Sequence, residues 1–284
     1  MRSTYKLMGI ADFITLFNGL LGSLSIMFII LAVEDMQNPY LEGGLKTDYI
    51  WAAMLCIILS ALGDIIDGPI ARRYSKRRLL GGSLDLMSDT ISFALAPALL
   101  VFVMYGRMGE STPLWTVAMA IACCWLIVCG MLRLARFDYE DGSKNAFFIG
   151  ISSPASAMFV ISVSGMIWLQ PITGYGPELT TWDCSLCFGK GAAKPWGDFL
   201  LLPVMIISGS LMISDWKTFK LKHGLPLKLT IIQFLAILGA VLYALIYTAT
   251  DDSVSDLSGM IPAFVGFTIS TGLVLMYIIL GPRI

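Results

Sequence analysis

Charged residues are scarce in this sequence. They make up 14% of its 284 residues, whereas hydrophobic residues make up 57% and the mean hydropathy is +0.78. Soluble domains typically contain about a quarter charged residues and are about half apolar. The composition therefore excludes an ordinary soluble domain and indicates an integral membrane protein.

Side chains that bind zinc or nucleic acid are also few. His223 is the single histidine, and it lies in a loop beside lysines, where we expect solvated surface. Cys184 and Cys187 form Cys-x2-Cys in a loop too poor in further ligands for a zinc site, so they are expected to form a local disulfide or to stay free thiols. No basic groove with interleaved aromatic residues is present, so no nucleic acid partner is expected.

Long hydrophobic runs, in contrast, are abundant. A helix needs about 20 apolar residues to cross the hydrocarbon core of a bilayer. The first run is too long for a cleaved signal peptide and has no small-residue cleavage site after it. We therefore predict an all-α, polytopic helical bundle that forms a single domain over residues 1–284. Its eight expected spans are residues 13–33, 50–66, 86–105, 114–134, 151–170, 199–214, 229–248 and 260–281.

Lysine and arginine are distributed unevenly along this predicted topology. With eight spans and both termini on one side, that side collects 15 of the 19 basic residues. Cytoplasmic loops close to span ends carry the positive excess in membrane proteins. We therefore expect a multi-pass protein of the cell membrane with both termini in the cytoplasm.

Four aspartates enter segments that are otherwise typical of membrane spans. Asp64 and Asp67 lie three residues apart near the end of the second span, and Asp85 and Asp89 lie four apart at the start of the third, so each pair shares a helix face. A short connection makes these spans antiparallel neighbours, so the two faces can converge at the cytoplasmic end. Carboxylates at membrane depth repel one another unless a cation neutralises them, and hard oxygen ligands suit Mg²⁺ or Mn²⁺.

The alternative is a cytoplasmic salt network between these acids and the basic residues of the connection, Arg72, Arg73, Lys76, Arg77 and Arg78. Most of that basic cluster lies outside the span, whereas the aspartates reach inside it. The metal site is therefore the favoured interpretation.

The residues between the two acidic pairs also favour a ligand. Gly68, Ala71 and Gly81 are small, so they would let a ligand approach the backbone closely. Arg72 suits a bidentate grip on phosphate or carboxylate. The complete pattern is Asp64-x2-Asp67-Gly68-x2-Ala71-Arg72-x8-Gly81-x3-Asp85-x3-Asp89.

This pattern resembles, at every fixed position, the signature of the CDP-alcohol phosphatidyltransferase family of membrane enzymes. The resemblance implies transfer of a phosphatidyl group from a CDP-linked lipid to a small alcohol, with release of CMP. It also implies a homodimer whose subunits have a core of six transmembrane helices. Here that core would cover about residues 11–220, and the last two spans, about 229–281, would be additions.

The resemblance implies roles for individual residues as well. Those matching the four aspartates bind two divalent metal ions, Mg²⁺ or Mn²⁺, and Asp89 is in addition the proposed general base. The CDP moiety is held by the residues matching Gly68, Ala71, Arg72 and Gly81. Two metals can clamp a diphosphate and neutralise the charge that develops during displacement, while a carboxylate takes the proton of the attacking hydroxyl.

Three further stretches, residues 11–22, 133–157 and 209–220, resemble the phosphatidylserine synthase branch and its archaetidylserine relatives. They imply L-serine as the acceptor and CDP-diacylglycerol or CDP-archaeol as the donor. Asp138 stands where the branch usually has Asn, and Ile151 or Ser152 stands where it usually has proline. The alternatives are another small alcohol, such as glycerol phosphate or inositol phosphate, and a divalent-metal transporter. Spans four to eight carry essentially no acids, which disfavours the transporter.

Four polar residues outside the signature have two interpretations each. Arg133 and Arg136, with Lys144, could bind the carboxylate of serine, or the two arginines could only extend to lipid phosphates. Thr15 and Asn18, one helical turn apart in the first span, could hydrogen-bond the nucleotide or a neighbouring helix.

Overall fold

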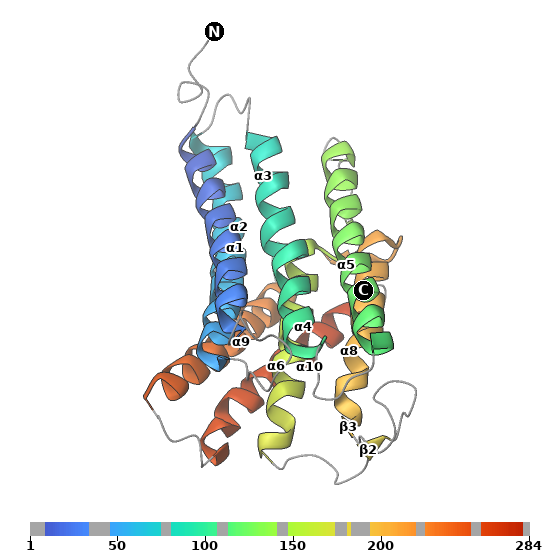
Figure 1. Ribbon diagram of the computed structural model, residues 1–284. Helices are drawn as coiled ribbons and strands as arrows, with labels where there is room; N and C mark the ends of the chain where they lie inside the picture. Colours follow the sequence, from blue (N-terminus) through green and yellow to red (C-terminus); the bar gives the residue numbers. More distant parts are fainter. Residues whose placement is uncertain are drawn as a thin grey trace.

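Helices dominate the structure, a computed structural model that describes residues 9–33, 46–74, 81–106, 113–140, 147–173, 181–182, 194–219, 225–250 and 257–280 (Figure 1). The all-α bundle predicted from the sequence is confirmed. Its α-helices are α1 (Ile10–Ala32), α2 (Thr47–Tyr74), α3 (Gly81–Asp89), α4 (Ala96–Tyr105), α5 (Pro113–Glu140), α6 (Ser153–Thr173), α8 (Trp196–Ile213), α9 (Leu225–Thr250) and α10 (Ile261–Leu280). A π-helix, η2 (Thr90–Leu95), joins α3 to α4, and a 3-10 helix, η3 (Leu257–Met260), precedes α10.

The described helices include six segments that are long and apolar enough to cross a membrane. They are Asp12–Ala32, Thr47–Ile66, Gly81–Tyr105, Pro113–Arg136, Leu227–Ala249 and Ile261–Ile279. Two predicted spans, 151–170 and 199–214, fall on α6 and α8, whose apolar parts with described side chains are Ser153–Leu169 and Leu200–Ile213. The chain is therefore a multi-pass membrane protein, and α3, η2 and α4 together make one of its spans.

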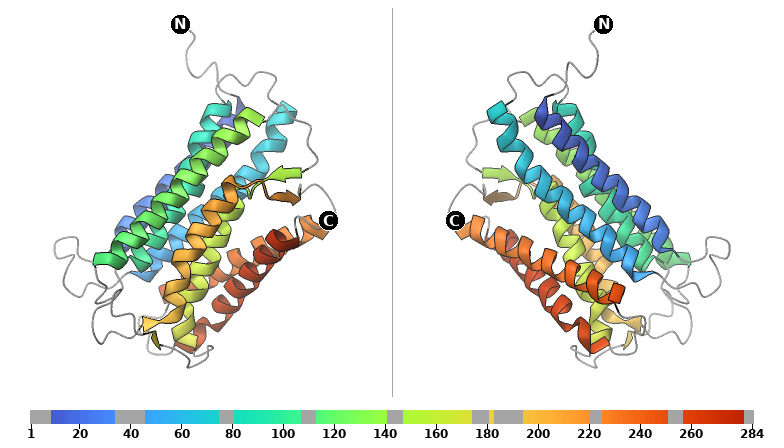
Figure 2. Two further views of the ribbon diagram at one scale, coloured as in Figure 1. Left: turned by 90° about the vertical axis from the view of Figure 1, so that its right-hand side faces the viewer. Right: turned by 90° about the vertical axis from the view of Figure 1, so that its left-hand side faces the viewer.

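Two short antiparallel strand pairs join connecting segments, which the sequence pattern did not predict. β1 (Phe147–Ile149) pairs with β4 (Lys217–Phe219), and β2 (Thr181–Trp182) pairs with β3 (Lys194–Pro195). Because β1 precedes α6 and β4 follows α8, the first pair fixes the entry to α6 beside the exit from α8 (Figure 2).

The signature lies at one end of the bundle, at the end of α2 and the start of α3. There α1 and α3 begin and α2 and α5 end (Figure 1). Helix α8 packs against α5 and α6, while α9 and α10 pack against each other and against α2 and α6 (Figure 2). The division into a core at 11–220 and additional helices at 229–281 stays a prediction.

Serine hydroxyls join α1 to its two neighbours. Ser60 on α2 and Ser92 on η2 both donate to the backbone oxygen of Asn18, at 3.2 and 3.1 Å. Ser88 on α3 donates to the backbone oxygen of Thr15 at 2.9 Å. Small residues and hydroxyl groups let transmembrane helices approach closely and hydrogen-bond where no water competes. These bonds hold α1, α2 and α3 as one closely packed unit.

The π-helix η2 comes directly after the residues that carry the carboxylates in the chain. The N–H of Ala96 donates to the carbonyl of Ile91, five residues earlier, and Pro97 comes next. Proline has no N–H, and its ring collides with the carbonyl four residues before it, so a wider turn relieves the contact. Single π turns often occur at functional sites, and here the turn begins immediately after Asp89.

The α1–η2 contact predicts an effect of substitution at Gly22. An ideal Cβ at Gly22 would lie 2.9 Å from the Cα of Ser92, whereas one at Gly239 or Gly272 would have no neighbour within 4 Å. We expect Gly22→Ala to destabilise the protein by about 1–3 kcal/mol through overpacking. Thermal unfolding in detergent would measure this. Gly239→Ala and Gly272→Ala are matched controls that should be neutral or stabilising, because alanine favours a helix. Equal loss in all three would contradict the close-packing argument.

Candidate active site

Three aspartates from two helices form the centre of the candidate site. Asp64 extends from α2, while Asp85 and Asp89 lie one turn apart at the end of α3. Each offers a carboxylate oxygen, and these oxygen atoms all lie within 4.8 Å of one another. All three side chains are half-buried. The predicted convergence of the two helix faces is therefore present for these three residues.

The spacing of these oxygen atoms fits a divalent cation. Mg²⁺ binds oxygen ligands at about 2.1 Å, so opposite ligands in an octahedron are about 4.2 Å apart. Three carboxylate oxygens within 4.8 Å could surround one such ion after a contraction of less than an ångström. Carboxylate ligands also match the preference of Mg²⁺ and Mn²⁺ for hard donors. The cluster is consistent with metal binding.

The remaining signature residues are only partly described. Gly81 is buried at the first residue of α3. The backbone of α2 continues through the other members of the signature, but the side chains of these residues lie outside the described residues: Asp67, Gly68, Ala71 and Arg72. The same holds for the basic residues that could form the alternative salt network, which are Arg72, Arg73, Lys76, Arg77 and Arg78. Their predicted roles stay predictions, as does the second metal ion. Cys184, Cys187 and His223 also lie outside the described residues.

Asn18 lies next to the aspartate cluster in an unusual environment. Its side chain is 2% exposed, and its Oδ1 has no hydrogen-bond partner among the described residues. That atom occupies the space where Gly63, the residue before Asp64, would carry a Cβ. Gly63 thus admits the Asn18 side chain between α1 and α2. A buried amide oxygen without a partner is costly, and a ligand donor would satisfy it.

Both interpretations of Thr15 and Asn18 retain support. Their backbone oxygens accept the serine hydroxyls that hold α1 to α2, α3 and η2. This is the predicted contact with neighbouring helices, made by the backbone. The contact of the Asn18 side chain with the CDP-lipid stays a prediction. Thr15 is also buried, at 1% exposed.

The two arginines of α5 differ in their surroundings. Arg133 is 8% exposed, and its Nε donates to the backbone oxygen of Ile151 at 3.2 Å. Arg136 is more open, and its Nη2 donates to Oδ1 of Asp215 at 2.9 Å. Arg133 therefore holds the segment that enters α6, a structural role that neither sequence-based interpretation included. For Arg136, both acceptor binding and contact with lipid phosphates stay predictions.

Several residues of the site gave no signal in the sequence. Gly63 and Ser60 are ordinary residues of an apolar helix until Asn18 is placed against them. Ser88 and Ser92 gain significance only through their bonds to α1. Asp215 lies in one of the stretches that resemble the serine branch, but its pairing with Arg136 joins residues 79 positions apart. Only the three-dimensional packing identifies these contacts.

Comparison with known families agrees with this geometry. The family model described as CDP-alcohol phosphatidyltransferase matches residues 8–189, a range that includes α1 to α6 and the whole aspartate signature. The chain belongs to the CDP-alcohol phosphatidyltransferase family. The predicted family is thereby confirmed, and the matched range ends before α9 and α10.

Several curated relatives carry the names of enzymes that make serine phospholipids. The chain is 35% identical over 137 residues to a CDP-diacylglycerol–serine O-phosphatidyltransferase of Mycobacterium leprae (46% of this chain, 42% of the relative). It is 30% identical over 162 residues to the enzyme of that name from Saccharomyces cerevisiae (54% and 52%). It is 28% identical over 155 residues to an archaetidylserine synthase of Methanothermobacter thermautotrophicus (53% and 60%). The match thus spans about half the length of these relatives.

The carboxylate cluster predicts a specific loss of metal affinity on substitution. We expect Asp85→Asn to weaken Mn²⁺ binding about tenfold or more, because one of the converging ligands is lost. The fold should persist, because the change also removes carboxylate repulsion. Mn²⁺ titration of chelator-treated protein, followed by electron paramagnetic resonance, measures the affinity. Asp48→Asn, an exposed change at the opposite end of α2, is the matched control. Unchanged Mn²⁺ affinity in Asp85→Asn would exclude this carboxylate as a ligand.

Proposed function

We propose that this protein transfers a phosphatidyl or archaetidyl group from a CDP-linked lipid to the hydroxyl of L-serine and releases CMP. The observation that carries the proposal is the convergence of Asp64, Asp85 and Asp89 within 4.8 Å in a chain of this family. The serine relatives support the choice of acceptor. Two divalent ions, Mg²⁺ or Mn²⁺, would be bound by these residues together with Asp67.

The chemistry is a displacement at the phosphorus that carries the lipid. The serine oxygen forms a bond to this phosphorus while the bond to the oxygen of CMP breaks, and the serine proton leaves at the same stage. Bound metal ions would neutralise the negative charge that develops on the diphosphate. Asp89 would accept the proton, because carboxylates serve as general bases when they lie within hydrogen-bond distance of the hydroxyl.

The donor would be held by residues on α1, α2 and α3. Gly68, Ala71, Arg72 and Gly81 follow from the signature, and Thr15 and Asn18 adjoin it on α1. The unsatisfied Oδ1 of Asn18 could accept a hydrogen bond from the cytosine amino group or from a ribose hydroxyl. Its burial against Gly63, the residue before Asp64, supports a role in binding the nucleotide.

The acceptor would approach from α5. Arg136 could bind the serine carboxylate, because a guanidinium matches a carboxylate in a bidentate geometry. Arg133 would act indirectly, since its Nε is bonded to the backbone of Ile151. Glycerol phosphate and inositol phosphate remain the alternative acceptors. The distribution of basic residues supports an active site at the cytoplasmic face of the cell membrane, and the family resemblance supports a homodimer.

An acceptor panel tests the proposed function directly. Purified protein in detergent would be incubated with CDP-diacylglycerol or CDP-archaeol, Mn²⁺ or Mg²⁺, and L-serine, glycerol 3-phosphate or inositol phosphate. We expect metal-dependent CMP release with L-serine, together with a serine lipid as the product. If CMP is released only with glycerol 3-phosphate or inositol phosphate, that alcohol replaces serine as the proposed acceptor. Uptake of Mn²⁺ into protein-containing liposomes, with no CMP release, would favour a transporter.

Substitution of Asp89 tests the mechanism. We expect Asp89→Asn to retain CDP-lipid binding through the other residues but to lower kcat by about 10² to 10⁴-fold or more, the usual contribution of a general base. Donor affinity and single-turnover rate would be measured side by side at saturating serine. If donor binding collapses while the rate at saturation stays near normal, Asp89 is only a metal ligand.

A further inference from the structure

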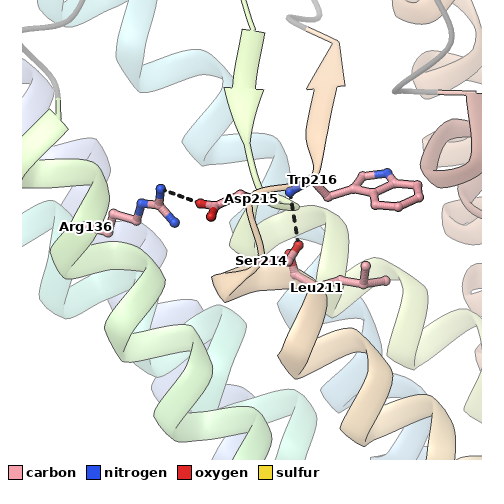
Figure 3. Close-up of polar contacts among 5 residues, drawn as sticks. All are labelled: Arg136, Leu211, Ser214, Asp215 and Trp216. Carbon is pink, nitrogen blue, oxygen red and sulfur yellow. Dashed lines mark hydrogen bonds and ion pairs between the residues drawn. The ribbon is translucent and has the colours of Figure 1, made fainter.

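An ion pair outside the aspartate cluster joins the end of α5 to the exit from α8. Nη2 of Arg136 and Oδ1 of Asp215 are 2.9 Å apart (Figure 3). The Arg136 side chain is 35% exposed and the Asp215 side chain is 88% exposed. Solvent-exposed ion pairs add little to stability. The contribution of this pair to stability is therefore small. The pair places an anion and a cation side by side at a surface that solvent reaches.

The backbone that carries Asp215 is fixed on both sides. Ser214 donates to the carbonyl of Leu211 at 2.9 Å and accepts from the N–H of Trp216 at 3.3 Å (Figure 3). The carbonyl of Trp216 accepts from the N–H of Gly150 at 2.7 Å, and the Trp216 indole donates to the carbonyl of Ile278 at 3.0 Å. Asp215 is thus an open side chain on a braced segment, which suits a binding group.

The depth of Arg136 in the bundle matches that of Asp89. A Cβ on Gly130 of α5 would lie 2.8 Å from the Cβ of Ala94, so these two residues are level with each other. Helix α5 runs antiparallel to the span that contains η2. At the 1.5 Å per residue of an α-helix, Arg136 lies about 9 Å beyond Gly130, and Asp89 lies at most about 7.5 Å from Ala94 in the same direction, because the wider π turn of η2 rises less per residue. The ion pair and the proposed general base therefore lie near one level.

We propose that Asp215 binds the ammonium group of a free amino acid acceptor while Arg136 binds its carboxylate. This rests on the proposed function, in which the acceptor is L-serine. An amino acid carries its ammonium and carboxylate groups on the same carbon, so a neighbouring cation and anion complement both. Glycerol phosphate and inositol phosphate have no ammonium group, so Asp215 would select against them.

Other described carboxylates are poorly placed for this role. Asp12 is fully buried and accepts from the N–H of Gly9 at the start of α1. Asp48 lies at the far end of α2. Asp64, Asp85 and Asp89 form the cluster assigned to metal. Asp215, by contrast, is paired with Arg136 of α5.

The competing explanation is that the ion pair is only a clip between α5 and the α8 exit. Two unreactive inhibitors separate these roles, because neither has a hydroxyl. L-Alanine carries both charges of serine, whereas propionate lacks the ammonium group. Each would be titrated against incorporation of labelled serine into lipid, together with the KM for serine and kcat. Loss of a clip would weaken both inhibitors alike, whereas loss of an ammonium site would weaken only L-alanine.

We expect Asp215→Asn to raise the KM for serine and the inhibition constant of L-alanine about ten- to hundredfold, the usual range for a charge-assisted hydrogen bond. The inhibition constant of propionate should stay within about twofold or fall, because a nearby negative charge is removed. The kcat should change much less than KM. Asp215→Glu should recover part of the affinity, and Asp48→Asn should behave like the unsubstituted protein.

Three results would overturn the ammonium site. These are an unchanged KM for serine in Asp215→Asn, equal weakening of L-alanine and propionate, and no recovery in Asp215→Glu. If the unsubstituted protein releases CMP with serine, these results leave the proposed function intact. If it does not use serine, the proposed function fails first, and the ammonium site fails with it.

Discussion

The constraint on which the structure depends is the presence of three carboxylates within 4.8 Å of one another, inside helices that cross a membrane. Their mutual repulsion opposes the close approach of α2 and α3, so other contacts must hold these helices in place. Helix α1 supplies them. Its backbone oxygens at Thr15 and Asn18 receive hydroxyls from α2, α3 and η2. Glycines at 22 and 63 remove the side chains that would keep the helices apart.

The convergence of the acidic residues could be predicted from sequence because it is a local property. Helix periodicity places Asp85 and Asp89 on one face, and the short connection from α2 to α3 makes those helices antiparallel neighbours. Apolar runs likewise predicted the positions of the helices. The burial of α6 could not be predicted in this way: it is largely buried where the structure describes its side chains, and a run of hydrophobic residues does not distinguish such a helix from a lipid-facing one.

The contacts that complete the site depend on residues far apart in the chain. The pairing of β1 with β4 joins segments about 70 residues apart, and neither three-residue strand has an alternating pattern that would predict it. The accommodation of Asn18 by Gly63 likewise requires the exact register of α1 on α2. The π turn could be suspected from Pro97, but proline near the start of a helix is also tolerated without one. Tertiary packing decides each of these cases.

Arg133 and Arg136 show how neighbouring residues with one prediction acquire separate roles. They lie three residues apart, yet one is buried against the backbone of Ile151 and the other is paired with an exposed carboxylate. Ile151 is also one of two positions where the serine branch usually has proline, and its N–H donates to Leu211 at 3.3 Å, a bond that proline could not make. Here the entry to α6 is therefore held by a backbone bond to α8 and by Arg133. With Arg133 so engaged, Arg136 is the more exposed arginine of the two, and it lies beside Asp215 at the exit from α8.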